Sequence, residues 1–370
     1  MTRASLNDLP LRDDLRGRQP YGAPQLDVNV RLNVNENSYA VPESVALAIV
    51  EAVAAQVRTL NRYPDREFTA LREKLAKYLN AGLDDEHRLT ADNIWAANGS
   101  NEVLQQIVQA FGGHDRTALG FVPSYSMHPI ISQGISTRWM AVDRDADFQV
   151  DREDAVRAVT ELQPDVVFLC TPNNPSGTAL DLATIEAIYD VAPGIVIVDE
   201  AYAEFSRSGT RSALTLLPGR ERLIVSRTMS KAFSLAGARV GYLAADPAVT
   251  DAIRLVRLPY HLSALTQAAA GAALDHSDEL LGNVEALKAQ RDRIVQTLPR
   301  FGVRPFPSDS NFVLFGGLSD AHTVWQRLLD RGILIRDVGI PGHLRVNAGT
   351  EAETSAFLDA LGEILGETPQ

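Results

Sequence analysis

The stretch DVVFLCTPNN, residues 165–174, decides the fold class. An uninterrupted apolar run ends there in a polar turn, and the same pattern recurs along the middle of the chain. The other runs of this kind are ALGFVPSY (118–125), IVIVDEAY (195–202), LIVSRTMSK (223–231) and VGYLAA (240–245). Continuous apolarity is typical of strands that are buried on both faces. Segments with helical spacing lie between several of them, so the sequence predicts a mainly parallel α/β sheet.

The flanks of this region predict an arm and a second, smaller domain. The first residues are polar and contain Pro10, Pro20 and Pro24, which is typical of an arm. Beyond about residue 260, a long helix precedes short strands and two further helices, which predicts an α+β unit. We therefore expect an N-terminal arm at 1–30, a large domain at 31–262 and a small domain at 263–370.

Composition excludes several classes of protein. The 370 residues include 35 Lys and Arg against 47 Asp and Glu, a net charge of −12. This balance is against a nucleic-acid binder but allows a local basic pocket for a small anion. The single cysteine, Cys170, excludes an internal disulfide, and the seven histidines lack the spacing of metal ligands, so we expect no metal site.

The N-terminus lacks the apolar core of a signal peptide, and no stretch approaches the ~18 apolar residues of a membrane span. We expect a cytoplasmic protein without a membrane partner.

The strongest chemical signal is the run from Ser226 to Lys231, with Arg239 eight positions later. Thr228 and Ser230 can hydrogen-bond a phosphate, and an arginine can neutralise it with two parallel hydrogen bonds. Lys231 then lies beside that anion as a candidate amine nucleophile. Taken alone, the run could equally be a basic, exposed turn between a strand and a helix.

A second signal is Asp199 at the end of a buried strand, followed by Tyr202. A carboxylate there could keep a pyridine nitrogen protonated, which makes the ring an electron sink. Tyr202 could donate a hydrogen bond to an oxygen on the ring. The alternative is an ordinary helix-capping aspartate beside a tyrosine of the core.

Two polar turns complete the pattern. The turn TPNNPSG (171–177) holds the amide of Asn174 in a defined place. Asn98-Gly99-Ser100-Asn101 opens a helix, whose backbone N–H groups and positive dipole end form a ready anion site. Each turn alone could be nothing more than turn chemistry or a helix cap.

Together and in this order, these segments resemble the fold-type I pyridoxal-phosphate aminotransferases, over nearly the whole chain. The supporting stretches are NVNEN (33–37), NRYPD (61–65), PSYSM (123–127), PSDSNF (307–312), IRD (335–337) and LRV (344–346). The resemblance implies a large domain with a mainly parallel seven-stranded sheet flanked by helices, and a smaller α+β C-terminal domain. Two mild departures from the common pattern are Ser38, where proline is frequent, and Ser176, where threonine is frequent.

The resemblance also implies a role for each matching residue. Lys231 would hold pyridoxal phosphate as a Schiff base, with Asp199 on the ring nitrogen and Tyr202 as the third catalytic residue. The further cofactor contacts would be Asn174 with Tyr202 at the ring hydroxyl, Tyr125 stacked on the ring, and Ser100, Asn101, Thr228, Ser230 and Arg239 around the phosphate. Tyr63 would reach the cofactor site of a neighbouring subunit, which implies a homodimer. The substrate contacts would be Arg345 and Arg336 at an anionic group, with Tyr21, Asn35 and Tyr260 in the pocket wall. Arg336 could instead pair with Asp337.

Within the family, the chain is most similar to the subgroup that acts on histidinol phosphate with 2-oxoglutarate or glutamate as partner substrate. A transaminase of aromatic amino acids such as phenylalanine would share every cofactor residue, so that alternative stays open. A decarboxylase of an amino-acid phosphate and a non-catalytic pyridoxal-phosphate-binding regulator are two further alternatives. A regulator would need a basic DNA-binding segment, for which the acidic chain offers no room outside the enzyme pattern.

Overall fold

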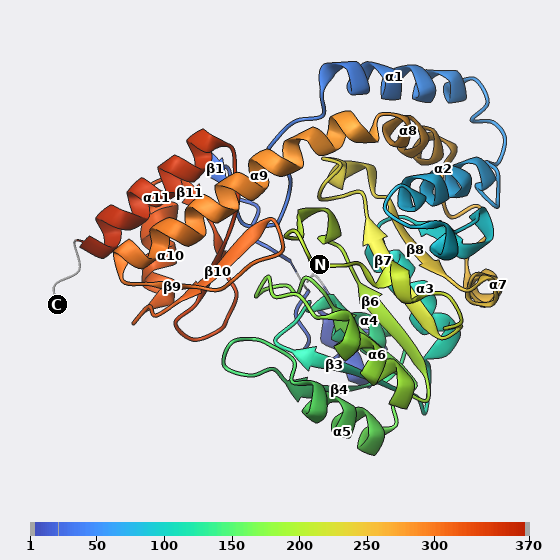
Figure 1. Cartoon of the computed structure of the whole chain (residues 1–370), viewed down its shortest axis with the longest axis horizontal. Coiled ribbons are helices and arrows are strands. Elements are labelled where there is room, and N and C mark those ends of the chain that lie inside the picture. The colour runs from blue at the N-terminus through green and yellow to red at the C-terminus, as the bar shows by residue number, and fades with distance from the viewer. Residues whose placement is uncertain (1–3, 21, 367–370) are drawn as a thin grey trace.

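A seven-stranded sheet lies at the centre of the larger part of the molecule (Figure 1). In order across the sheet, its strands are β2 (Ile94–Ala97), β8 (Gly241–Ala245), β7 (Leu223–Thr228), β6 (Ile195–Asp199), β5 (Val166–Cys170), β3 (Thr117–Val122) and β4 (Arg138–Asp143). All neighbouring pairs are parallel except the two that involve β8. The computed structural model describes residues 4–20 and 22–366.

Helices pack around this sheet and bury its strands on both faces. They are α1 (Glu43–Val57), α2 (Thr69–Asn80), α3 (Ser100–Phe111), α4 (Met127–Gly134), α5 (Arg152–Leu162), α6 (Leu182–Val191), α7 (Pro247–Val256) and α8 (Ala264–Asp275). Every residue of β5, β6, β7 and β8 is buried, as the continuous apolar runs predict. The predicted fold class, a mainly parallel α/β sheet of the fold-type I kind, is confirmed.

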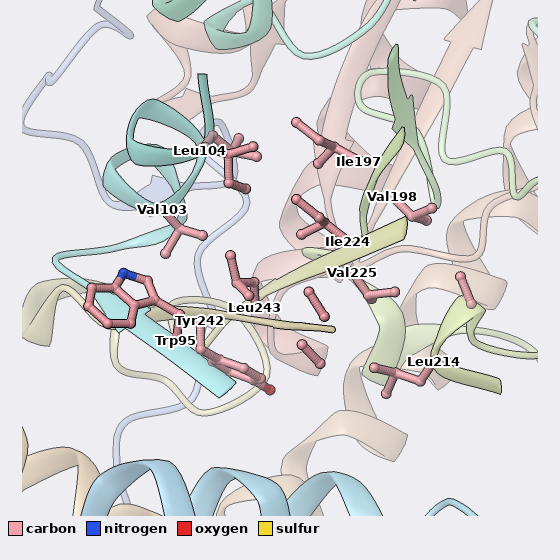
Figure 2. Packing of buried hydrophobic residues seen from close by; sticks show 14 of the residues in the cluster. Trp95, Val103, Leu104, Ile197, Val198, Leu214, Ile224, Val225, Tyr242 and Leu243 are labelled. Atoms are coloured by element: carbon pink, nitrogen blue, oxygen red, sulfur yellow. The ribbon is translucent and has the colours of Figure 1, made fainter. Parts of the chain in front are cut away.

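The core of this unit includes Trp95 and Tyr242, two large buried side chains on the neighbouring strands β2 and β8 (Figure 2). Trp95 is fully buried and donates its indole N–H to Gln106 Oε1 at 2.7 Å. Its ring stacks on His261, with ring centroids 5.5 Å apart. A buried indole that keeps a hydrogen-bond partner makes a large apolar contact without leaving a buried donor unpaired. Because Gln106 lies in the middle of α3, this bond ties that helix to β2.

The second unit contains a four-stranded antiparallel sheet in the order β12 (Arg336–Asp337), β13 (Leu344–Asn347), β10 (Phe312–Gly316) and β9 (Arg304–Pro305). A short parallel pair, β1 (Val30–Arg31) and β11 (Ile333–Leu334), lies beside α10 (Ala321–Asp330) and α11 (Glu351–Gly366). The predicted α+β character of the C-terminal region is therefore present.

The long helix α9 (Ser277–Thr297) joins the two units, and the orange ribbon in Figure 1 shows it running from α8 toward α11. Leu280, Val284 and Leu287 belong to the core of the large unit, whereas Ile294 belongs to the core of the small unit. The same helix therefore serves both hydrophobic cores.

The division into 1–30, 31–262 and 263–370 stays a prediction, and the packing favours different limits. Helix α8 packs on α1 and α2 of the large unit, although it follows residue 262. Strand β1 pairs with β11, and Leu32 lies in the small unit's core. We propose that the boundary runs inside α9 and that residues 30–32 belong to the small unit. No helix within the described ranges is long and apolar enough to cross a membrane.

A single glycine tests the packing between β5 and β6. A Cβ at Gly194 would lie 2.0 Å from the backbone oxygen of Asp165, so Gly194→Ala has to displace the backbone at the start of β6. We expect this change to lower the free energy of unfolding by about 2 kcal/mol. Urea unfolding followed by circular dichroism measures it. Gly282→Ala is the matched control, because that helix position is open and alanine is the better helix former. Equal midpoints for the two variants would contradict the expected clash.

Candidate active site

A cavity of about 500 Å³ lies where the carboxyl ends of β5, β6 and β7 face the small unit. Parallel strands bring their loops to one edge of a sheet, and ligands of such sheets bind at that edge. Most of the predicted site residues line this cavity, namely Asn35, Ser100, Asn101, Tyr125, Asn174, Asp199, Tyr202, Thr228, Ser230, Lys231, Arg239, Arg336 and Arg345. Their roles are not tested by this placement and stay predictions.

Lys231 follows β7 on the turn that borders the cavity. Its Nζ donates a hydrogen bond to the backbone oxygen of Val34 at 3.2 Å. Burial, followed by the positive charges of Arg345 and Arg239, lowers the pKa of Lys231 to about 8. About a tenth of this amine is therefore uncharged at pH 7, far more than for an ordinary lysine, and the uncharged form acts as a nucleophile or a base.

Asp199 ends β6 and is 2% exposed. Its Oδ2 lies 3.0 Å from His128 Nε2, and its Oδ1 accepts a hydrogen bond from Ser226 Oγ at 3.1 Å. His128 is itself buried, stacks on Phe168 at 4.6 Å between ring centroids, and meets Tyr125 edge to face. The carboxylate is therefore held in one orientation by two partners, as a counter-ion of a buried ring must be.

The seven histidines show no metal-ligand spacing in the sequence, which therefore predicts no role for His128. The histidine is buried, but its ring nitrogen contacts the carboxylate predicted to carry the chemistry. The available signal was its position three residues after Tyr125, at the start of α4. Tyr125 precedes the helix, and its backbone oxygen accepts a hydrogen bond from the backbone N–H of His128 at 3.1 Å, so this turn brings the two rings into edge-to-face contact.

An anion site forms where α3 begins. Ser100 and Asn101 are its first residues, so unpaired backbone N–H groups point at the cavity. Gly99, at φ +89°, precedes them, and a Cβ there would lie 2.5 Å from Arg239 Nη2. Only glycine lets this guanidinium close over the helix start.

The other wall of the anion site comes from the turn after β7. Thr228 Oγ1 lies 3.0 Å from Ser230 Oγ and accepts a hydrogen bond from the backbone N–H of Ser230 at 3.1 Å. These contacts hold two hydroxyl groups close together beside the helix start. Hydroxyl and backbone donors together with one arginine are the donor set that a phosphate ester requires.

Tyr202 and Asn174 also line the cavity, and each contacts a residue on the small unit's sheet, Phe312 and Arg345 respectively. Asn35 Nδ2 donates to the Tyr202 hydroxyl at 2.8 Å, and burial raises the pKa of Tyr202, which keeps the phenol protonated. Arg345 donates to the side-chain oxygen of Asn174, and to the backbone oxygen of Asn33 at 2.9 Å. The guanidinium of Arg345 also lies 4.9 Å from the centre of the Phe312 ring.

Arg336 and Arg345 are direct cross-strand partners on β12 and β13, and both line the cavity. Like charges directly opposite each other destabilise a sheet unless an anion lies between them. The alternative pairing of Arg336 with Asp337 is not formed: that carboxylate contacts His322 Nδ1 at 3.3 Å and accepts from the backbone N–H of Gly339 at 2.9 Å. The two guanidinium groups are placed to bind a dianion or two carboxylates.

Two predicted residues, Tyr63 and Tyr260, do not line this cavity. Tyr63 is 81% exposed and stacks on Tyr260, with ring centroids 4.4 Å apart. Tyr21 lies outside the described residues.

The cavity fits pyridoxal phosphate. The anion site matches the phosphate, the buried carboxylate of Asp199 matches a protonated ring nitrogen, Tyr125 offers an aromatic face, and the Lys231 amine matches the aldehyde. Among the described residues, no group of three histidine, cysteine or carboxylate side chains is arranged to hold a metal ion.

Comparisons with known proteins agree with this chemistry. The family model for class I and II aminotransferases matches residues 28–361. A histidinol-phosphate aminotransferase of Paenarthrobacter aurescens (strain TC1) is 63% identical over 366 residues, covering 98% of this chain and 97% of the relative. One of Thermobifida fusca (strain YX) is 59% identical over 360 residues, covering 97% and 96%.

A solved structure supports the same assignment. The crystal structure of histidinol-phosphate aminotransferase from Sinorhizobium meliloti in complex with pyridoxal-5'-phosphate has a TM-score of 0.82 and 27% sequence identity. The match covers 92% of this chain and 91% of that chain. Because the family model spans most of the chain and relatives of similar length are more than half identical to it, the chain belongs to the class I and II aminotransferases.

Proposed function

We propose that this protein is a pyridoxal-phosphate-dependent transaminase that exchanges an amino group between histidinol phosphate and 2-oxoglutarate, within histidine biosynthesis. In the biosynthetic direction, glutamate gives its amino group to imidazole-acetol phosphate. Nearly full-length relatives are named for this activity. One structural observation carries the enzyme class: the Lys231 amine lies in a cavity that is also lined by Asp199 and by two arginines, which are cross-strand partners on β12 and β13.

The predicted cofactor contacts all line the cavity. The residues that would hold the phosphate are Ser100, Asn101, Thr228, Ser230 and Arg239. Asn174 and Tyr202 would contact the ring hydroxyl, and Tyr125 would cover the ring. Pyridoxal phosphate, when bound, supplies an electron sink that stabilises negative charge on the amino-bearing carbon of a substrate. Asp199, oriented by His128 and Ser226, holds the proton at the ring nitrogen.

Lys231 moves the proton that the reaction requires. Its uncharged Nζ accepts a proton from the amino-bearing carbon of the substrate and returns one to the cofactor side, acting first as a base and then as an acid. A pKa of about 8 suits both steps near neutral pH, because neither form of the amine is rare. The backbone oxygen of Val34, 3.2 Å from Nζ, orients the amine between transfers.

The arginine pair suits both amino donors. Glutamate carries an α-carboxylate, whereas histidinol phosphate lacks one and offers a phosphate instead. A guanidinium binds either group through two parallel hydrogen bonds, so Arg345 and Arg336 can serve both half-reactions. Phenylalanine also carries a carboxylate, and the relatives rather than the arginine pair favour histidinol phosphate.

The protein works as a homodimer in this proposal, with each subunit contributing to its partner's site. The surface that includes Tyr63 and Tyr260 also exposes Leu255 and Leu258, at 86% and 76%. Helix α1 buries only Val45 among its described side chains, so its outer face is uncovered too. Exposed apolar groups gathered in this way are typical of protein interfaces. Tyr63 would lie at the neighbouring cavity rather than at its own.

We also place the enzyme in the cytoplasm. Its one cysteine, Cys170, is buried and unpaired, a composition that suits a reducing compartment. The proposed substrates are small anions. A net charge of −12 repels the phosphate backbone of nucleic acids, so we propose no nucleic-acid partner.

A direct assay tests the activity. The purified protein, loaded with pyridoxal phosphate, is given histidinol phosphate or phenylalanine as amino donor to 2-oxoglutarate. We expect kcat/KM for histidinol phosphate to be higher by roughly a hundredfold or more, because a polar site discriminates strongly against a ligand that leaves its groups unpaired. Lys231→Ala should abolish turnover while the phosphate contacts still bind some cofactor. Equal use of phenylalanine would move the function to aromatic transamination, and full turnover by Lys231→Ala would refute the enzyme class.

His128→Phe tests how Asp199 is positioned. Phenylalanine keeps the stacking on Phe168 but removes the contact to the carboxylate, so kcat should fall about ten- to a hundredfold, since a hydrogen bond to a charged group is worth about 1.5–3 kcal/mol. Steady-state kinetics with glutamate and 2-oxoglutarate measure this. His128→Gln, which keeps a donor, should retain more activity. The exposed His114 provides the control His114→Phe. Unchanged kcat in His128→Phe would exclude the positioning role.

Mixed dimers test the shared site. Lys231→Ala and Tyr63→Ala homodimers are each impaired, but a hybrid dimer joins an intact Lys231 with its partner's intact Tyr63. Random exchange makes about half of the dimers hybrids with one complete site, so roughly a quarter of the wild-type activity should return. A mixture of Lys231→Ala with Asp199→Ala is the control, since both residues line the same cavity of one chain. Activity equal to the mean of the two Tyr63 and Lys231 homodimers would show that each site is complete within one chain.

A further inference from the structure

Among the described residues that line the cavity, cationic side chains outnumber carboxylates. Four are cationic: Lys231, Arg239, Arg336 and Arg345. Two are carboxylates, Asp199 and Glu36. The carboxylate of Asp199 is buried and already bound by His128 and Ser226. Glu36 is therefore the acidic group of the cavity that the proposed chemistry does not yet use.

Backbone contacts fix the position of Glu36. Asn311 Nδ2 donates to the backbone oxygens of Asn35 and Glu36, at 3.2 and 3.4 Å. On the other side, Asn37 Nδ2 donates to the backbone oxygen of Ala232, next to Lys231, at 3.3 Å. The segment that carries Glu36 is thus tied both to the small unit and to the lysine turn, so its place at the cavity does not depend on its side chain.

The carboxylate itself is available to a ligand. Glu36 is exposed yet lines the cavity, and within the described residues its side chain takes part in no hydrogen bond or ion pair. Its negative charge also affects the reacting amine. Burial lowers the pKa of Lys231, and the charge of Glu36 raises it, which offsets part of that decrease. A carboxylate with this exposure and these neighbours can accept a hydrogen bond from a donor on a bound substrate.

The substrate of the proposed function supplies one such donor. In the proposed function, the phosphate of histidinol phosphate binds the arginine pair and its amine reacts beside Lys231. The imidazole ring is then the one polar group of the substrate that has no assigned partner. An imidazole carries at least one N–H, and with a pKa near 6.5 it gains a positive charge in mildly acidic solution. Neither phenylalanine nor glutamate has a group of this kind on its side chain.

We propose that the Glu36 carboxylate accepts a hydrogen bond from the imidazole N–H of the amino donor and thereby determines substrate specificity. This inference rests on the proposed function. It assigns Glu36 to one half-reaction only, because glutamate, the donor of the other half-reaction, offers no N–H on its side chain and carries a carboxylate that Glu36 repels.

A competing explanation is that Glu36 acts only through the charge of Lys231. Lys231 serves both half-reactions, so this effect would change both equally. Single-turnover measurements separate the two explanations, because histidinol phosphate and glutamate can each be reacted alone with the loaded enzyme and followed by the absorbance of the cofactor.

The kinetic test uses Glu36→Ala and Glu36→Gln. For Glu36→Ala, we expect the second-order rate constant of the histidinol phosphate half-reaction to fall about tenfold or more, while that of the glutamate half-reaction stays within about twofold. Glu36→Gln keeps an acceptor oxygen and should lie between this variant and the wild type. Glu221→Gln, an exposed glutamate at the start of the turn before β7, is the matched control. An equal loss in both half-reactions, or no loss in either, would overturn the inference.

A binding measurement supplies an independent readout. Histidinol phosphate is titrated into Lys231→Ala protein with and without Glu36→Ala, at pH 6 and pH 8, in a calorimeter. The affinity lost with the carboxylate should be larger at pH 6, where the imidazole is mostly charged. A loss that is zero or the same at both pH values would contradict a contact with the ring. Wild-type enzyme that does not turn over histidinol phosphate refutes the proposed function itself, whereas normal turnover by the Glu36 variants refutes only this inference.

Discussion

The parallel register of β5, β6 and β7 is the constraint on which the site depends. Cys170 lies opposite Asp199, and Asp199 lies opposite Ser226, so three loops leave the sheet side by side. Side chains alternate between the faces of a strand, and a shift of one residue in β6 would turn Asp199 away from the cavity. Such a shift would also exchange the apolar side chains of β6 between the two faces of the sheet, both of which are packed against buried neighbours. The hydrophobic core therefore fixes the direction of the carboxylate.

The small unit provides the part of the cavity wall that the edge of the large sheet does not. Arg345 reaches from β13 to the Asn174 side chain and to the backbone of Asn33, and Asn311 holds the segment that carries Asn35. Behind these contacts, Arg291 is 1% exposed and donates to the backbone oxygens of Phe205 and Ser310 at 2.7 and 3.3 Å. Breaking these hydrogen bonds would leave a buried charge without partners, so separating Arg291 from either carbonyl oxygen would cost free energy. Arg291 thus ties the segment that follows β6 to the segment that leads into β10 in the small unit.

Much of this arrangement could be predicted from the sequence, because its strands carry continuous apolar runs. Lys231, Asp199 and Asn174 each follow such a run, so their presence at one edge was predictable. His128 was not, since a histidine near a helix start has no periodic signal, and its partner is 71 residues away. Glu36 lay within a recognised stretch, but its freedom from other partners is visible only in three dimensions. The domain limit was obscured because the apolar spacing of α9 continues without a break through both cores.

That unbroken helix has a consequence for how the molecule can move. Hinge motions between domains need a few residues whose backbone angles can change, and such residues are usually found in a connecting loop. Here the connection across α9 is helical over 21 residues, with its hydrogen bonds in place. Rotating the small unit about this connection would require the helix to bend, or Leu287 and Ile294 to slide against the cores in which they are packed. We therefore expect the small unit to move by a small shear along α9, with access to the cavity regulated by shorter segments at its rim.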